Sequence, residues 1–169
     1  MRPDNFPMRL PTLFLALACA LPAVRAQQAP SFATPARDAA AAYIAQGDFI
    51  VTRLAAECLS VVGRAESPQT FVGTWKKRNQ RYVNASSRYI DMRLQEAAGR
   101  GPGERDALMK QVRAAVQDNG EAAVRGLLQG RKEEGCMYGV TLVDTGSLDI
   151  KPGTSQYEQL EALAKWAEE

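Results

Sequence analysis

The stretch "PARDAAAAYIAQGDFIVTRLAAECLSVVG", residues 35–63, decides the fold that this sequence predicts. Its first residue is a proline that follows a threonine, a typical helix start because the missing N–H of proline costs nothing in the first turn. Small and apolar residues then recur at steps of three and four, and the final glycine suits a helix end. We therefore expect a long amphipathic helix that buries one face, with these members: Tyr43, Gly47, Ile50, Val51, Leu54, Cys58, Val61 and Val62.

Further helices are predicted on the C-terminal side of this one. Ser67-Pro68 repeats the cap-then-proline signal, and the helix that it begins should run to about Ala98 and stop in "GRGPG", residues 99–103. A shorter helix is expected over 104–117, and another after "DNG", residues 118–120, with Cys136 on its apolar face. The sequence thus predicts an all-α, single-domain bundle of four to five helices over residues 35–169, stapled by one disulfide.

The predicted bundle ends with a helix that begins at Thr154-Ser155. Glu158 stands three residues after Ser155, the spacing of a capping box. The long helix predicted over 68–98 has an apolar face in which two polar residues, Asn79 and Ser86, interrupt the pattern. If Asn79 is buried, its amide needs hydrogen-bond partners, because an unpaired buried amide is costly.

The N-terminal residues predict export. Residues 8–26 read "MRLPTLFLALACALPAVRA", with a basic start, a short apolar core and a small-x-small cleavage site. We interpret residues 1–26 as a signal peptide cut after Ala26 and residues 27–34 as a flexible leader, which places the mature chain in the periplasm or outside the cell. We expect no lipid at Cys19, because it follows Ala16, Leu17 and Ala18, whereas a lipobox usually has a large aliphatic residue followed by a small one. No later stretch is long and apolar enough to predict a membrane span.

Cleavage would leave two cysteines, Cys58 and Cys136. A metal site of the Cys/His type is not expected, since the chain contains no histidine and such sites use four ligands. A catalytic thiol would lack its usual histidine base. An oxidising compartment favours a disulfide between the two, and Gly135 and Gly139 would let their helix approach its neighbour closely.

The charge of the mature chain is balanced but unevenly placed. Loss of residues 1–26 removes three of 21 basic and one of 19 acidic side chains, which leaves 18 of each and argues against nucleic-acid binding. Residues 64–113 hold 11 basic and 5 acidic side chains, whereas residues 114–169 hold 5 basic and 10 acidic ones. We expect these two segments to pair within one fold; the alternative is a dipolar surface that steers a partner.

The stretch "TWKKRNQRY", residues 74–82, is the candidate binding region. Aromatic residues interleaved with cations can bind anions, although on a helix Trp75 and Tyr82 would face the core and the cations would form a solvated basic face over 76–93. A polar notch beside the aromatic pair could also form a small pocket. The candidate residues are Trp75, Lys77, Arg78, Asn79, Arg81 and Tyr82.

The stretch "VTLVDTGSLDI", residues 140–150, resembles the active-site motif of aspartic proteases around Asp144. That family sets two aspartates around one water and is built of strands, whereas this chain holds one copy between predicted helices. We expect instead a helix that ends with Gly146 as its left-handed cap, although the β-branched residues leave a short strand open.

The sequence marks no catalytic constellation and implies no cofactor. The leading hypothesis is a non-catalytic exported helical protein that binds another envelope or secreted protein, as inhibitors, immunity proteins and adaptors do. One alternative is a periplasmic protein that binds a small ligand or polyanion through the Trp75/Asn79 region. Another is a carboxylate-dependent hydrolase around Asp144. The sequence leaves the oligomeric state open.

Overall fold

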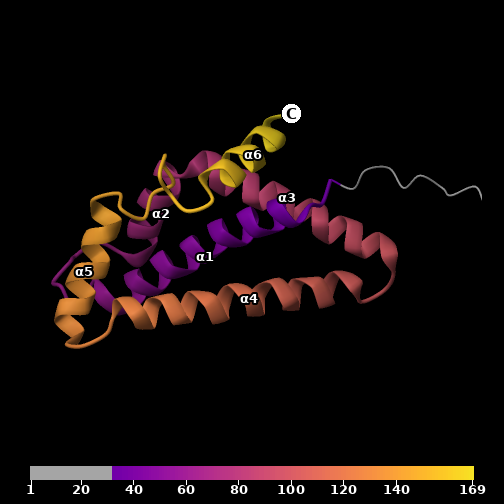
Figure 1. The fold of residues 1–169 in the computed structure, drawn as a ribbon. Coiled ribbons are helices and arrows are strands. Elements are labelled where there is room, and N and C mark those ends of the chain that lie inside the picture. Colours follow the sequence, from indigo (N-terminus) through magenta and orange to yellow (C-terminus); the bar gives the residue numbers. More distant parts are fainter. Residues whose placement is uncertain (1–31) are drawn as a thin grey trace, which may run out of the picture. The chain divides into compact units, whose positions relative to one another are not determined.

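A computed structural model describes residues 32–169, and within that range every regular element is an α-helix (Figure 1). The six helices are α1 (Pro35–Cys58), α2 (Pro68–Arg78), α3 (Gln80–Arg100), α4 (Glu104–Leu127), α5 (Lys132–Asp144) and α6 (Tyr157–Glu168). The all-α single domain and the disulfide between Cys58 and Cys136 are confirmed. The predicted signal peptide, with Cys19, lies outside the described residues. None of the described helices is long and apolar enough to cross a membrane.

Helix α1 is the axis of the domain and packs against each of the other five helices (Figure 1). The Thr34 hydroxyl caps its first turn by accepting the backbone N–H of Arg37, as the threonine–proline start predicted. The folded part includes Phe32, which stacks on Trp166 although it lies in the segment that we expected to be a flexible leader.

Two hydrophobic clusters lie along α1. The first surrounds the disulfide, where the C-terminal part of α1 meets α2 and α5. The second joins the N-terminal half of α1 to α3 and α6, and it includes the edge-on contact of Tyr89 with Trp166. Fully enclosed members of the two clusters include Val51, Leu54, Trp75, Tyr89, Val143, Leu160 and Leu163.

The predicted helix over 68–98 is interrupted at Asn79, which explains why six helices are present instead of four or five. The backbone of Asn79 leaves the helical region, with φ −102° and ψ 16°. Its own N–H still bonds to the Trp75 carbonyl, and its carbonyl accepts the N–H groups of Tyr82 and Val83, so α3 starts at once. The chain therefore bends at Asn79 with little loss of backbone hydrogen bonds.

The predicted helix boundary at residues 118–120 is wrong, because α4 continues through this stretch to Leu127. Gly120 is buried, and a Cβ there would lie 2.3 Å from the ring of Phe49 on α1. Burial of this part of α4 against α1 outweighs the local turn preference of Asp-Asn-Gly. The break comes later, and Gly130 adopts a left-handed φ of 88° between α4 and α5.

The expected capping box at Ser155 does not form. Helix α6 starts at Tyr157, later than the predicted start at Thr154-Ser155. The residue before it, Gln156, is left-handed with φ 61°. The Thr154 hydroxyl accepts the N–H of Lys151 instead and closes a turn in the preceding segment.

Candidate functional site

The candidate region 75–82 spans the junction of α2 and α3. Trp75 and Asn79 are each 1% exposed, and Tyr82 lies against the second cluster at 9%. Lys77, Arg78 and Arg81 lie on the outer side. The burial of Trp75 and Tyr82 confirms the predicted core stripe, and Asn79 is a buried polar residue that needs partners. The cations Arg78 and Arg81 are not simply solvated, because both are paired with carboxylates.

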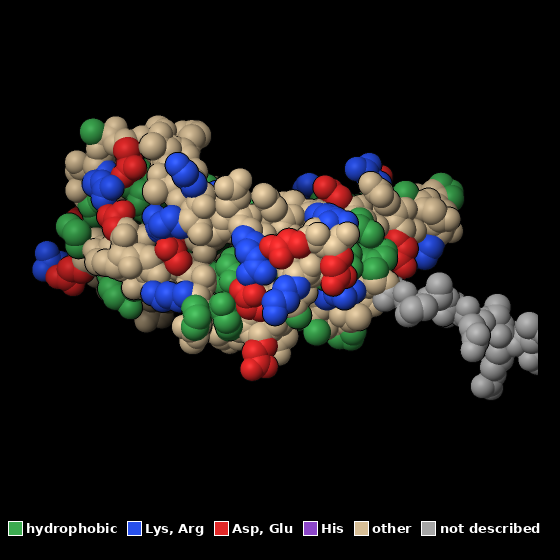
Figure 2. Space-filling model, turned by 90° about the horizontal axis from the view of Figure 1, so that it is seen from above, with side chains coloured by type: hydrophobic (Ala, Val, Ile, Leu, Met, Phe, Trp, Pro, Cys, Tyr) green, Lys and Arg blue, Asp and Glu red, His purple; other side chains and the backbone are tan. Residues whose placement is uncertain are grey.

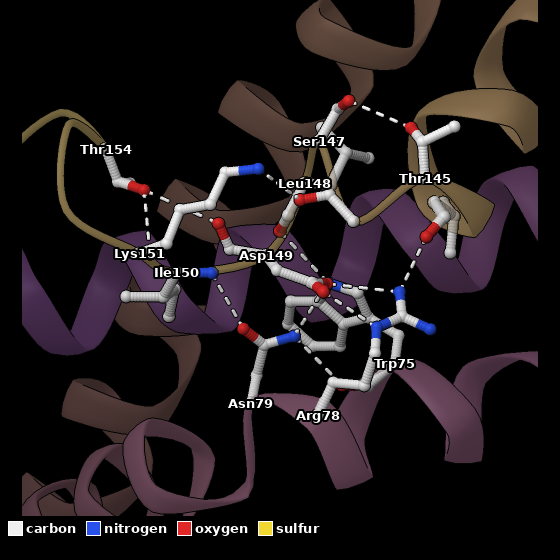
Figure 3. A network of polar contacts seen from close by, with 12 residues as sticks. Trp75, Arg78, Asn79, Thr145, Ser147, Leu148, Asp149, Ile150, Lys151 and Thr154 are labelled. Atoms are coloured by element: carbon white, nitrogen blue, oxygen red, sulfur yellow. Dashed lines mark hydrogen bonds and ion pairs between the residues drawn. The ribbon is translucent and has the colours of Figure 1, made fainter.

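The side chain of Asn79 is fully used in holding two segments together (Figure 3). Its amide nitrogen donates to the Trp75 carbonyl at 2.9 Å and to Oδ1 of Asp149 at 3.1 Å. Its amide oxygen accepts the backbone N–H of Ile150 at 2.8 Å. The two partners at 149 and 150 belong to the loop between α5 and α6, about 70 residues away in the sequence.

Asp149 is the centre of this network (Figure 3). Arg78 binds its carboxylate with two nitrogens, Nε at 2.7 Å and Nη2 at 3.1 Å, and donates from Nη2 to the Val143 carbonyl at 2.6 Å. The indole N–H of Trp75 donates to the Leu148 carbonyl at 3.1 Å. A bidentate arginine–carboxylate pair fixes orientation as well as charge, so the loop is clamped to the α2–α3 junction.

Arg81 and Tyr82 are held by acidic residues of α6. The Arg81 guanidinium binds Glu161 and Glu168, each at 2.7 Å, while the Tyr82 hydroxyl donates to Glu161. Hydrogen bonds from Tyr82 and Arg81 lower the pKa of Glu161 to about 2. The hydrogen bond to Glu168 and that to Glu161 raise the pKa of Arg81, and burial is the main cause of the raised pKa of Tyr82.

The basic and acidic segments pair with each other, as expected. Ion pairs join Arg64 to Asp144, Arg78 to Asp149 and Arg81 to both of its α6 partners. Basic and acidic side chains are interspersed over the face shown in Figure 2. Three of the six candidate binding residues are buried, and Arg78 and Arg81 are paired with carboxylates. Lys77 is the remaining one: it is exposed and forms no ion pair within residues 32–169.

A groove of about 460 Å³ lies beside Trp75, between α1 and the loop 147–155. The edge of the indole forms part of its floor, and a Cβ at Gly47 would stand 3.3 Å from that edge. Tyr43, Ile44 and Ile50 supply its apolar wall, and Lys151 stands on the loop side. Asn79 does not line the groove, although the sequence left open a small pocket beside it; its side chain bonds instead to Asp149 and Ile150 of the loop that forms the wall.

Asp144 ends a helix and is no strand residue. It closes α5, and the chain turns through Gly146, whose left-handed φ of 68° and N–H bond to the Val143 carbonyl make the predicted cap. Its carboxylate accepts Arg64 at 2.7 Å, and that hydrogen bond is the main cause of the raised pKa of Arg64. Glu66 binds the same guanidinium, so the two carboxylates meet at a cation.

The two cysteines are bonded to each other in the first cluster. Both are 0% exposed, and their Cα atoms lie 4.9 Å apart. Close approach of α5 depends on glycine, because a Cβ at Gly139 would stand 2.7 Å from a methyl of Leu54. Among residues 32–169, no group of three or more His, Cys, Asp or Glu side chains is placed to hold a metal ion.

Sequence reasoning missed Asp149 and the loop that it anchors. The signal in the sequence was Asn79, a polar residue on an apolar stripe. A buried amide needs hydrogen-bond partners, but the sequence does not indicate which residues these are. Sequence reasoning also missed Met137 and Tyr138 on α5. Each is 56% exposed, and they are the two exposed large apolar side chains of the described region.

The chain matches no protein-family model, no curated protein and no solved structure.

Proposed function

We propose that this chain is an exported, non-catalytic protein that binds a segment of another envelope or secreted protein in the groove between α1 and the loop 147–155. Inhibitors, immunity proteins and adaptors act in this way. The observation that carries the proposal is the groove itself, a concave site of about 460 Å³ lined by apolar side chains of α1 and by the loop 147–155.

The wall of the groove is held in place before any partner arrives. Trp75 bonds to the loop from the floor of the groove, whereas Arg78 and Asn79, which do not line the groove, both bond to Asp149. A preformed wall binds without the entropy cost of ordering a loop, which favours affinity. The same bonds occupy the carboxylate of Asp149, which lines the groove, and the amide of Asn79, which does not, so these groups support the shape of the site and leave recognition to the other lining residues.

The groove lining favours a polypeptide ligand. Aliphatic side chains of α1 oppose a loop that carries serine, threonine and lysine side chains together with its backbone. An apolar side chain of a partner can occupy such a site while the partner backbone meets the polar rim. Met137 and Tyr138 belong to residue types that are enriched in protein interfaces, and they give a partner a second point of contact.

Export is supported by the buried disulfide, because such bonds persist in oxidising compartments. The predicted signal peptide 1–26 agrees with this location. The intact mass of the protein recovered from a periplasmic or secreted fraction tests it. We expect the mass of residues 27–169 with one disulfide, and a mass that contains acyl chains on Cys19 would contradict the proposed processing.

A photo-crosslinking amino acid at Gln46, on the rim of the groove, tests the binding site. The matched control carries the same amino acid at Gln117, which is exposed on α4 and does not line the groove. We expect one discrete protein adduct in the envelope from position 46 and none from position 117. Adducts of equal yield at both positions, or at neither, would refute the groove as a protein-binding site.

A small ligand in the same groove is the second candidate, since its floor and walls are concave and largely apolar. Native mass spectrometry of the exported protein separates the two candidates. A small retained mass that disappears in a Gln46→Trp variant favours the small ligand. A polyanion is less well supported, because Arg78 and Arg81 already bind carboxylates.

A further inference from the structure

The first half of α4 is packed differently from the second. The first buried residue of α4 is Gly120, and Val124 follows at 3% exposure. Glu121 binds Arg53 of α1 at 3.3 Å and helps to hold this second half. Before Gly120 the helix carries apolar residues that are only half-buried, namely Leu108, Met109, Val112 and Val116.

These residues face a cleft of about 320 Å³ that α1 and α3 close from the other side. Ala41 and Ala42 of α1 are short and leave space, while Tyr89, Ile90 and Leu94 of α3 form an apolar wall. The α1 residues that line this cleft are different from those of the groove beside Trp75. A concave, apolar space between three helices is a typical ligand site of a helical bundle.

The charged groups of the cleft are already paired within the protein. Asp38 accepts the hydroxyl of Tyr89 at 2.8 Å and lies 3.4 Å from Nε of Arg93. Arg93 also binds Glu96 at 2.9 Å, and Arg100 lies 3.8 Å from the same carboxylate. These two cations and two carboxylates balance, so an anionic ligand would have to displace a carboxylate from Arg93.

We propose that the cleft between α1, α3 and the first half of α4 binds one uncharged aliphatic chain of medium length. The apolar walls of the cleft favour an aliphatic ligand. The charges of Asp38 and Arg93 are paired with each other and therefore exclude an ionised head group. The aliphatic ligand enters beside the first half of α4, which is the less buried part of that helix. Gly120 and Val124, in the second half, stay against α1.

The test uses the neutral fluorescent probe N-phenyl-1-naphthylamine and the exported protein with its disulfide intact. We expect saturable binding of one probe per chain. The double variant Ala42→Phe/Ala115→Phe fills the cleft and should weaken binding at least tenfold. The control Ala39→Phe/Ala114→Phe adds the same rings at exposed positions of the same two helices outside the cleft, and it should bind like the wild type.

Competition on the wild type decides the chemistry even if the filled variant does not fold. Hexanol, octanol and decanol should displace the probe with an affinity that rises about fourfold for each added methylene, the value expected for burial of one methylene. Decanoate should compete at least tenfold more weakly than decanol. No dependence on chain length, equal competition by decanoate, or equal loss of probe binding in both double variants would overturn the proposal.

This inference is independent of the proposed protein-binding groove. A Gln46→Trp variant should keep its affinity for the probe, because residue 46 lines the groove and not the cleft. Loss of the probe in that variant would mean that the probe occupies the groove, and it would refute the assignment to the cleft.

Discussion

The disulfide between Cys58 and Cys136 should supply a large part of the free energy of unfolding of this domain. The bond joins residues 78 positions apart. The chain-entropy relation for a loop of this length gives roughly 4.5 kcal/mol at 25 °C, an upper value because residual structure in the unfolded chain reduces it. We expect the double variant Cys58→Ala/Cys136→Ala to lose about 3–4 kcal/mol, since alanine avoids burying an unpaired hydroxyl in the core.

The native contacts between the joined helices should survive without the bond. Gly139 packs on Leu54, and Val140 and Val143 belong to the same cluster as both cysteines. Most of the loss should therefore arise in the unfolded state, which expands when the bond is absent. The urea m-value should increase in the double variant for the same reason, because a more expanded chain exposes more surface.

Urea unfolding of the oxidised wild type, the two single variants and the double variant measures these quantities. The double variant should lose at most about 1 kcal/mol more than either single variant, because the two cysteines act as one unit. Reductant is the control: it should lower the stability of the wild type and leave the double variant unchanged. A loss below about 1 kcal/mol, or single losses that add up in the double variant, would refute the reasoning.

Three further predictions concern residues that the fold brings together. Asn79→Leu removes three hydrogen bonds to buried or half-buried partners and should cost roughly 2–3 kcal/mol in urea unfolding, whereas a cost below about 0.5 kcal/mol would contradict the anchoring role. Gly120→Ala should lower the melting temperature despite the better helix propensity of alanine, because its Cβ would meet the ring of Phe49. Adding Phe49→Ala should remove most of that clash, and additive effects of the two substitutions would argue against the clash. Glu161 has a pKa of about 2, below that of an unfolded glutamate near 4.5, so its contribution should be complete above about pH 5 and lost as the pH falls towards 2. The difference in stability between wild type and Glu161→Gln should therefore be about 1–2 kcal/mol above about pH 5, a value lowered to allow for solvent screening, and should shrink as the pH falls towards 2. A difference that stays constant with pH would contradict the pairing.

The candidate site could be predicted from the sequence in part. The spacing of Trp75, Asn79 and Tyr82 placed all three on the buried side of their helices, and their burial confirms this. The spacing did not reveal that Asn79 ends one helix and starts the next. Helical periodicity is nearly unchanged across a break that keeps its backbone hydrogen bonds, so the apolar pattern carries no trace of the bend.

The sequence by itself determined the helical class, the starts of α1 and α2, and the bond between the two cysteines. These features depend on local spacing, on capping chemistry and on elimination among few cysteines, all of which can be read along the chain. The end of α5 at Gly146 belongs with them, because a glycine after the last periodic residue is a local signal.

Only the tertiary structure decided where α4 ends, what Asn79 binds and where the concave sites lie. Helix α4 passes through a turn-forming tripeptide because Gly120 meets Phe49 of α1. Asn79 and Asp149 meet across 70 positions of sequence, and no local preference specifies that contact. The groove and the cleft are spaces left between helices, and their volumes depend on the joint packing of side chains from distant segments, which the close packing of a protein interior fixes as a whole.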